Sequence, residues 1–126
     1  LHTAYRRQRQ MCIRDREYVY VVGLTTKTQA LGVFEISHGA VSASICNPRE
    51  IFIRLLLCGA STFVMIHNHP SGDTNPSKAD RMVAQKLKEA GDLLGITMID
   101  SIIIGYHYYL SMKENSNAKL LNRMSI

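Results

Sequence analysis

The chain has 126 residues, of which 46% are hydrophobic and 20% are charged, so it suits one compact globular domain and is too short for two. This composition excludes disordered, collagen-like and coiled-coil proteins. No apolar stretch approaches the roughly 20 residues needed to cross a bilayer, and no signal-peptide pattern is present, so we expect no membrane partner. The three cysteines are odd in number and lack the CxxC spacing, which favours a reducing, cytoplasmic location.

The net charge of +5 is concentrated at the amino terminus. Residues 1–16 hold five arginines and one aspartate, a net charge of +4, whereas the other 110 residues hold ten basic and nine acidic side chains, a net charge of +1. The segment 1–16 has no hydrophobic periodicity and resembles translated adapter sequence, so we interpret it as a non-native or disordered arm. We therefore expect the folded domain at 17–126 and no direct contact with nucleic acid.

The first predicted elements form a β-hairpin. β-Branched and aromatic residues dominate 18–24, a polar patch covers 25–29, and a second apolar run covers 30–36. A third strand is predicted over 40–46, where apolar residues alternate loosely.

A helix is predicted over 48–58 from three start signals: an asparagine N-cap, a proline at the first helical position and a glutamate three residues after the cap, which are Asn47, Pro48 and Glu50. Gly59 can end this helix. Its buried face is predicted to hold Ile51, Phe52, Leu55 and Leu56.

A strand and a second helix follow. The continuous apolar run 62–66 predicts a strand buried on both faces. Ser77 can cap a helix that ends at Gly95 and packs one face on the sheet. The apolar residues of that face recur at helical spacing, at Ala79, Val83, Leu87, Ala90 and Leu94.

The chain closes with two more strands, predicted over 97–104 and 106–110 and turned at Gly105. The polar tail from Lys113 is expected to be loosely held.

Two histidines and an aspartate flank the polar loop 70–76. Side chains two apart on a strand project to the same side, so His67 and His69 form half of a metal site at a strand end. Ser77 and Asp80 begin the next helix and face that strand end, so Asp80 could supply a carboxylate oxygen as the third ligand. Two histidines, one aspartate and an open fourth position are the pattern of a catalytic zinc site.

Each part of this pattern also has another interpretation. Ser77 with Asp80 is a capping-box-like helix start, which needs no metal. The tripeptide at 67–69 spells His-Asn-His, but the residues that name the HNH nucleases are dispersed along the chain, and here the tripeptide ends a buried strand. Four residue types at fixed spacing rarely coincide by chance, so we favour the metal site.

These motifs resemble the RadC family, whose carboxy-terminal part is a JAB/MPN metalloprotease-like domain that carries the JAMM motif. The segments that carry the resemblance are Pro48-Arg49-Glu50, the run from His67 to Asp73, Pro76-Ser77, Asp80, and Asp100 with the run from Ile102 to Gly105. The resemblance implies a cytidine-deaminase-like α/β fold with a mixed, curved sheet flanked by helices. It also implies that His67, His69 and Asp80 are the ligands of a Zn²⁺ cofactor and that Ser77 is the motif serine.

The family's motif also includes an upstream glutamate, for which Glu17, Glu35 and Glu50 are candidates. In the family this acid lies at the start of the strand that opens the sheet, and Glu17 begins such a strand here, so we choose Glu17. The alternative is that Glu17 is only a solvated charge at a strand edge.

Two departures from the family pattern are visible. Ser101 follows Asp100 where the family usually has a histidine. Many family members also carry an amino-terminal region resembling a helix-hairpin-helix, which is absent here, so we expect this chain to be a fragment.

The resemblance implies a zinc-dependent peptidase or isopeptidase that cleaves an amide bond in a protein or peptide. In this mechanism Glu17 acts as the general base and Ser77 hydrogen-bonds the developing oxyanion. A non-catalytic zinc-binding interaction module is one alternative. A DNA-repair or mobile-element accessory role is another, suggested by the family's historical name.

Overall fold

The computed structural model describes residues 17–38, 47–113 and 119–120. The arm expected at 1–16 and the strand predicted at 40–46 lie outside these residues. The described elements are β1 (Tyr18–Leu24), β2 (Ala30–His38), α2 (Pro48–Leu57), β3 (Thr62–Asn68), α3 (Lys78–Leu94), β4 (Thr97–Ile104), β5 (Tyr108–Ser111) and β6 (Lys119–Leu120).

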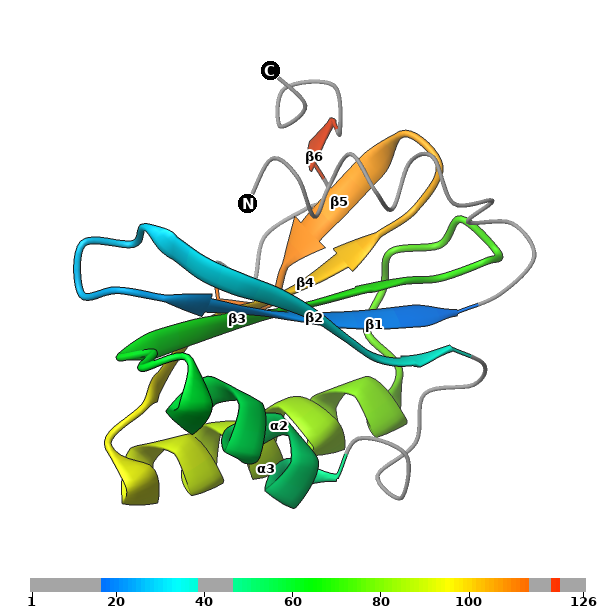
Figure 1. Ribbon diagram of the computed structural model, residues 1–126. Helices are drawn as coiled ribbons and strands as arrows, with labels where there is room; N and C mark the ends of the chain where they lie inside the picture. Colours follow the sequence, from blue (N-terminus) through cyan, green and yellow to red (C-terminus); the bar gives the residue numbers. More distant parts are fainter. Residues whose placement is uncertain (1–16, 39–46, 114–118, 121–126) are drawn as a thin grey trace.

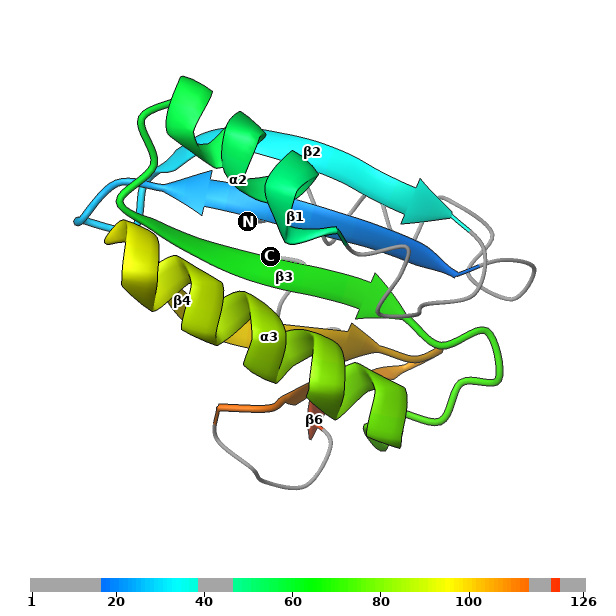
Figure 2. The same cartoon turned by 90° about the horizontal axis from the view of Figure 1, so that it is seen from below.

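The strands form one mixed sheet in the order β2-β1-β3-β4-β5-β6. Both described helices lie on the same face of this twisted sheet (Figure 1). Seen from that face, α2 lies over β1 and β2, and α3 runs along β3 and β4 (Figure 2). The predicted α/β fold is thereby confirmed, and none of the described helices is long and apolar enough to span a membrane.

β1 and β2 form the predicted hairpin, and a hydrogen bond from the Thr25 amide to the Gln29 carbonyl closes its turn. β2 ends at His38, two residues beyond the predicted end. On its other side β1 pairs antiparallel with β3, with Val19 opposite His67. The first residues of β1 therefore lie beside the last residues of β3.

α2 begins as predicted, with the Asn47 side chain accepting a hydrogen bond from the Arg49 amide at 3.0 Å. Three of the four residues predicted for its buried face are buried, namely Ile51, Phe52 and Leu55. The prediction was wrong for Leu56, which is 55% exposed. Leu56 lies at the margin of the helix's apolar stripe, one residue beyond Leu55, and the sheet contacts only the centre of that stripe.

β3 and β4 are parallel, so they need a crossover connection, and α3 provides it. α3 ends at Gly95, whose φ of 75° is left-handed. Its buried residues are Asp80, Val83, Leu87 and Gly91. The prediction was wrong for Ala79, which is exposed because the neighbouring Asp80 takes the buried position in the first turn. It was also wrong for Leu94, which is 50% exposed because the chain turns into β4 there and Ile96, at 3% exposed, takes the buried position.

The carboxy-terminal strands differ slightly from prediction. β5 begins at Tyr108 and not at residue 106, because a hydrogen bond from the Gly105 amide to the Tyr108 carbonyl closes a turn that takes up the intervening residues. The tail expected to be loosely held contributes β6, which pairs with β5.

The apolar core has two parts, one on each face of the sheet. On the helix-bearing face β1 and β3 bury alternate residues against α2 and α3, and this part includes Val19, Val21, Phe63, Met65, Ile51, Leu55, Val83 and Leu87. The other face buries the intervening residues, which include Tyr20, Val22, Val64, Ile66, Ile102 and Ile104. Since His67 continues the alternation of Phe63 and Met65, its side chain is on the helix-bearing face, toward α3.

Candidate metal centre

His67 and His69 meet at the carboxyl end of β3. His67 is the sixth residue of the strand and is fully buried, whereas His69 follows the strand and its side chain is 13% exposed. The Nε2 atoms of the two rings lie 3.2 Å apart. The strand alternation that predicted a pair on one side is therefore confirmed.

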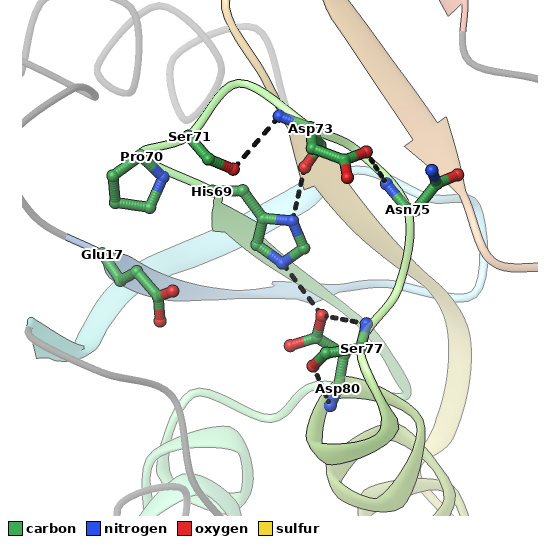
Figure 3. A pocket seen from close by; sticks show the side chains of 8 residues that line it. All are labelled: Glu17, His69, Pro70, Ser71, Asp73, Asn75, Ser77 and Asp80. Atoms are coloured by element: carbon green, nitrogen blue, oxygen red, sulfur yellow. Dashed lines mark hydrogen bonds and ion pairs between the residues drawn. The ribbon is translucent and has the colours of Figure 1, made fainter.

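Asp80 lies in the first turn of α3 and is 2% exposed. Its Oδ1 lies 3.1 Å from His67 Nε2, and its Oδ2 lies 2.9 Å from His69 Nε2. The loop 70–76 leaves the end of β3, and the first turn of α3 brings the Asp80 carboxylate back beside that end, as the spacing predicts (Figure 3).

The capping interpretation of Ser77 and Asp80 is also correct. The Ser77 hydroxyl accepts a hydrogen bond from the Asp80 amide at 3.0 Å, and Asp80 Oδ2 accepts one from the Ser77 amide at 2.8 Å. The capping box fixes the Asp80 side chain while leaving its carboxylate against the histidines. One pair of residues therefore starts the helix and supplies the acid.

The three side chains fit a metal ion. Each offers one ligand atom, and these atoms lie within 4.8 Å of one another. Donors about 2.05 Å from one tetrahedral zinc are about 3.3 Å apart, close to the 3.2 and 3.1 Å that separate His67 Nε2 from His69 Nε2 and from Asp80 Oδ1. His67, His69 and Asp80 could therefore bind a metal ion.

The tautomer of His69 also suits a ligand. Its Nδ1 lies 2.6 Å from the main-chain carbonyl oxygen of Asp73. A carbonyl only accepts hydrogen bonds, so Nδ1 carries the proton, and in the neutral ring the lone pair is on Nε2. That atom faces Asp80 and His67. A ligating histidine is commonly oriented in this way through its other nitrogen.

Asp80 and His69 shift each other's pKa in opposite directions. Burial on its own would raise the pKa of Asp80, but the hydrogen bonds from His67 and His69 outweigh it and hold that pKa well below its usual range. The hydrogen bond to Asp80 raises the pKa of His69, against the opposing effect of burial, and the Asp73 carbonyl and the charge of Glu17 act in the same upward direction. The ionised form of Asp80 and the protonated form of His69 therefore stabilise each other.

A cleft of about 520 Å³ opens onto this cluster. Its walls include the two remaining residues of the predicted site, Glu17 and Ser77 (Figure 3). Continuing the pairing of β1 with β3 by two residues brings Glu17 opposite His69. The Glu17 carboxylate points into the cleft (Figure 3). Of the other two glutamates considered, Glu35 lies on β2 and Glu50 in the first turn of α2, and neither lines the cleft.

Two contacts around the site were missed by sequence reasoning. The carbonyl of Asp73 orients His69, and the buried Asn68 side chain accepts a hydrogen bond from the Tyr18 amide at 2.5 Å. Every residue has a main-chain carbonyl, so residue types cannot predict the contact of the Asp73 carbonyl with His69. For the contact of Asn68 with Tyr18, the sequence did offer a signal, because Asn68 lies between the two motif histidines.

The departure at Ser101 lies away from the cleft. Ser101 is in β4, paired with Met65, and is 3% exposed, and its hydroxyl has no hydrogen-bond partner among the described residues. Asp100 accepts hydrogen bonds from the Ser111 hydroxyl and the Lys113 amide, so it ties the end of β5 to β4. Neither Asp100 nor Ser101 lines the cleft.

Comparison with known proteins bears on the identity of this site. The chain is 44% identical over 107 residues to a "UPF0758 protein" of Alkaliphilus metalliredigens, an alignment that covers 85% of this chain and 46% of that protein. It is 36% identical over 110 residues to a protein of the same name from Thermotoga maritima, covering 87% of this chain and 50% of the relative. The chain spans about half the length of the curated relatives it matches. Their shared name states no activity.

The sequence profile of the RadC-like JAB domain matches residues 2–117. The match includes the metal cluster and also nearly all of the segment 1–16. Since it covers most of the chain, the chain belongs to the RadC-like JAB domain family, as its motif predicted.

Proposed function

We propose that this domain is a zinc-dependent hydrolase of the metallopeptidase or isopeptidase type, which cleaves an amide bond in a protein or peptide. The observation that carries the proposal is the convergence of two imidazole nitrogens and one carboxylate at the base of an open cleft, with Glu17 on its wall. Three protein ligands with room for a fourth are typical of catalytic zinc, whereas structural zinc is held by four.

The ligands of the zinc would be His67, His69 and Asp80. When bound, zinc would act as a Lewis acid and lower the pKa of a water toward 7. Glu17 would take a proton from the attacking water, and the direction of its carboxylate, which points into the cleft opposite His69, supports this role. In the reaction the water oxygen bonds to the carbonyl carbon, the C–N bond breaks, and Glu17 returns the proton to the leaving nitrogen.

Ser77 would stabilise the carbonyl oxygen as negative charge develops on it. The Ser77 oxygen already accepts a hydrogen bond from the Asp80 amide, so its own proton remains available to donate. Ser77 is exposed in the wall of the cleft and can reach a substrate there. A single donor of this kind is typically worth about 3 kcal/mol in the transition state.

The first experiment tests the reaction class. Zinc-loaded protein is incubated with a peptide library and with a lysine-linked isopeptide substrate, with and without a chelator. Chelator-sensitive cleavage that is absent from the His67→Ala protein would support the proposal. A protein that binds zinc and cleaves neither substrate class would instead be the non-catalytic interaction module. Retention of DNA in a salt-dependent manner would favour the accessory role.

The second experiment tests the assignment of the base. Glu17→Gln is expected to keep zinc, because Glu17 is not a ligand, and to lose roughly 100-fold or more in kcat. Glu35→Gln and Glu50→Gln are matched controls that remove the same charge away from the cleft, so both are expected to keep their activity. If Glu35→Gln were the inactive variant, the assignment of Glu17 would be wrong.

A further inference from the structure

The loop between β3 and α3, residues 70–76, rests on the turn between β4 and β5. The Tyr106 hydroxyl donates a hydrogen bond to the Pro70 carbonyl at 2.5 Å. The ring of Tyr106 lies against Gly72, so closely that a β-carbon on Gly72 would be 2.7 Å from Tyr106 Cδ2. Gly72 also has a φ of 84°, which other residues rarely adopt. The loop and the ring are therefore fitted to each other.

Further contacts hold the loop on the same turn. A β-carbon on Gly105 would collide with the Gly72 carbonyl oxygen and would lie 2.9 Å from the Thr74 methyl group. Thr74 is 7% exposed, although it lies within a polar loop. The His69 amide donates to the Ile104 carbonyl at 2.9 Å, which ties the start of the loop to the end of β4.

The loop in turn holds a metal-binding histidine. Asp73, which lies between Gly72 and Thr74, places its carbonyl oxygen 2.6 Å from His69 Nδ1. Asp73 is itself restrained from within the loop, because its Oδ1 accepts a hydrogen bond from the Asn75 amide at 3.0 Å. A continuous set of contacts therefore runs from Tyr106 through Gly72 and Asp73 to the His69 ring.

We infer that Tyr106 is a positioning residue for the metal centre: it fixes the loop 70–76, whose Asp73 carbonyl holds His69 with Nε2 toward the ion. Tyr106 does not line the cleft and so has no contact with a substrate there. The part of the inference that concerns metal affinity rests on the proposed function. The part that concerns the orientation of His69 rests only on the contacts above.

The first test measures metal affinity. Tyr106→Phe keeps the ring against Gly72 and removes only the hydroxyl, so the protein is expected to fold. Removing a group that supports a ligand typically weakens metal binding by 10-fold to 100-fold, and we expect about tenfold here for Zn²⁺ in a chelator competition. Tyr108→Phe is the matched control, since Tyr108 is a tyrosine of the same hairpin that is 47% exposed. It is expected to bind Zn²⁺ like the original protein.

The second test observes the Nδ1 proton of His69 in the metal-free protein. A role of Tyr106 in stability alone would leave the signal of that proton unchanged. The Nδ1 proton of His69, bonded to the Asp73 carbonyl, should give an NMR signal that is protected from exchange with water. Tyr106→Phe should lose that protected signal, while Tyr108→Phe keeps it. Persistence of the signal in Tyr106→Phe, or Zn²⁺ affinities of the two variants within about twofold, would overturn the inference. If the original protein binds no Zn²⁺, the proposed function fails and the NMR result alone decides.

Discussion

Ser77 and Asp80 hold each other through both of their main-chain amides, at 3.0 and 2.8 Å. The carboxylate that faces His67 and His69 is therefore fixed by the start of its own helix and does not depend on a bound ion for its position. The candidate metal centre is therefore preorganised, and substitutions can be chosen that separate helix capping from metal binding.

Asp80→Asn should remove metal binding while keeping the helix start. An amide oxygen can still accept the hydrogen bond from the Ser77 amide, but it lacks the charge of a ligand. The affinity for Zn²⁺ should fall by at least about 100-fold, more than for an indirect contact. Zinc content by elemental analysis and competition with a chelator would measure this.

The control for that variant is Asp92→Asn on the same helix, where the carboxylate is 52% exposed and lies 3.5 Å from Lys88 Nζ. Full zinc content is expected there. Zinc retained by Asp80→Asn at the level of Asp92→Asn would contradict the assignment of the ligand.

Ser77→Ala should have two effects, on stability and on catalysis. Loss of the N-cap should lower the free energy of unfolding by about 1 kcal/mol. Loss of the hydroxyl donor should lower kcat by roughly 100-fold. Asn47→Ala removes the N-cap of α2 instead and should cost similar stability with no loss of kcat. Urea unfolding and steady-state kinetics on both variants would separate the two effects, and equal activities would remove Ser77 from the mechanism.

Zinc affinity should fall as the solution is acidified. The ion competes with a proton for His69, whose pKa is raised above its ordinary value, so the competition sets in at a higher pH than for an ordinary histidine. Below that pKa the affinity should fall about tenfold per pH unit for each proton displaced. Chelator competition between pH 8 and pH 5.5 would show the trend. An affinity independent of pH across this range would show that no histidine proton is displaced.

Gly91→Ala should destabilise the protein, although alanine is normally the better helix former by about 1 kcal/mol. Gly91 is buried in α3, where a β-carbon would collide with the Ile96 carbonyl oxygen and lie 3.1 Å from the Phe63 ring. Overpacking of this kind costs roughly 1–3 kcal/mol. A lowered thermal midpoint is expected, and an unchanged or raised one would show that α3 can move away from the sheet.

Local signals predicted most of the fold. The N-caps at Asn47 and Ser77 and the left-handed end at Gly95 depend on neighbouring residues only, and all three are present. The burial of Leu56, Ala79 and Leu94 was predicted wrongly, because burial near the margin or the end of a helix depends on how far the sheet extends under it. Helical spacing gives the direction of an apolar face but not the width of the surface that covers it.

The metal cluster could be predicted for a similar reason. Its three residues lie on one strand end and the next helix start, so strand alternation and capping place them. The support from Tyr106 could not be predicted, because it joins residues more than 30 apart along the chain through a hydroxyl and a main-chain carbonyl. Nothing in the residue types of the loop identifies that partner.

The division of the site between elements has a practical consequence for the design of truncated or chimaeric proteins. All three candidate metal ligands belong to the single unit of β3, loop and α3, whereas Glu17 immediately precedes β1, which pairs antiparallel with β3. A chain in which β1 is displaced could keep its ion and still lack the base. The metal content of such a preparation would then exceed the fraction of molecules that can catalyse the reaction. Titration of active sites would measure that fraction directly.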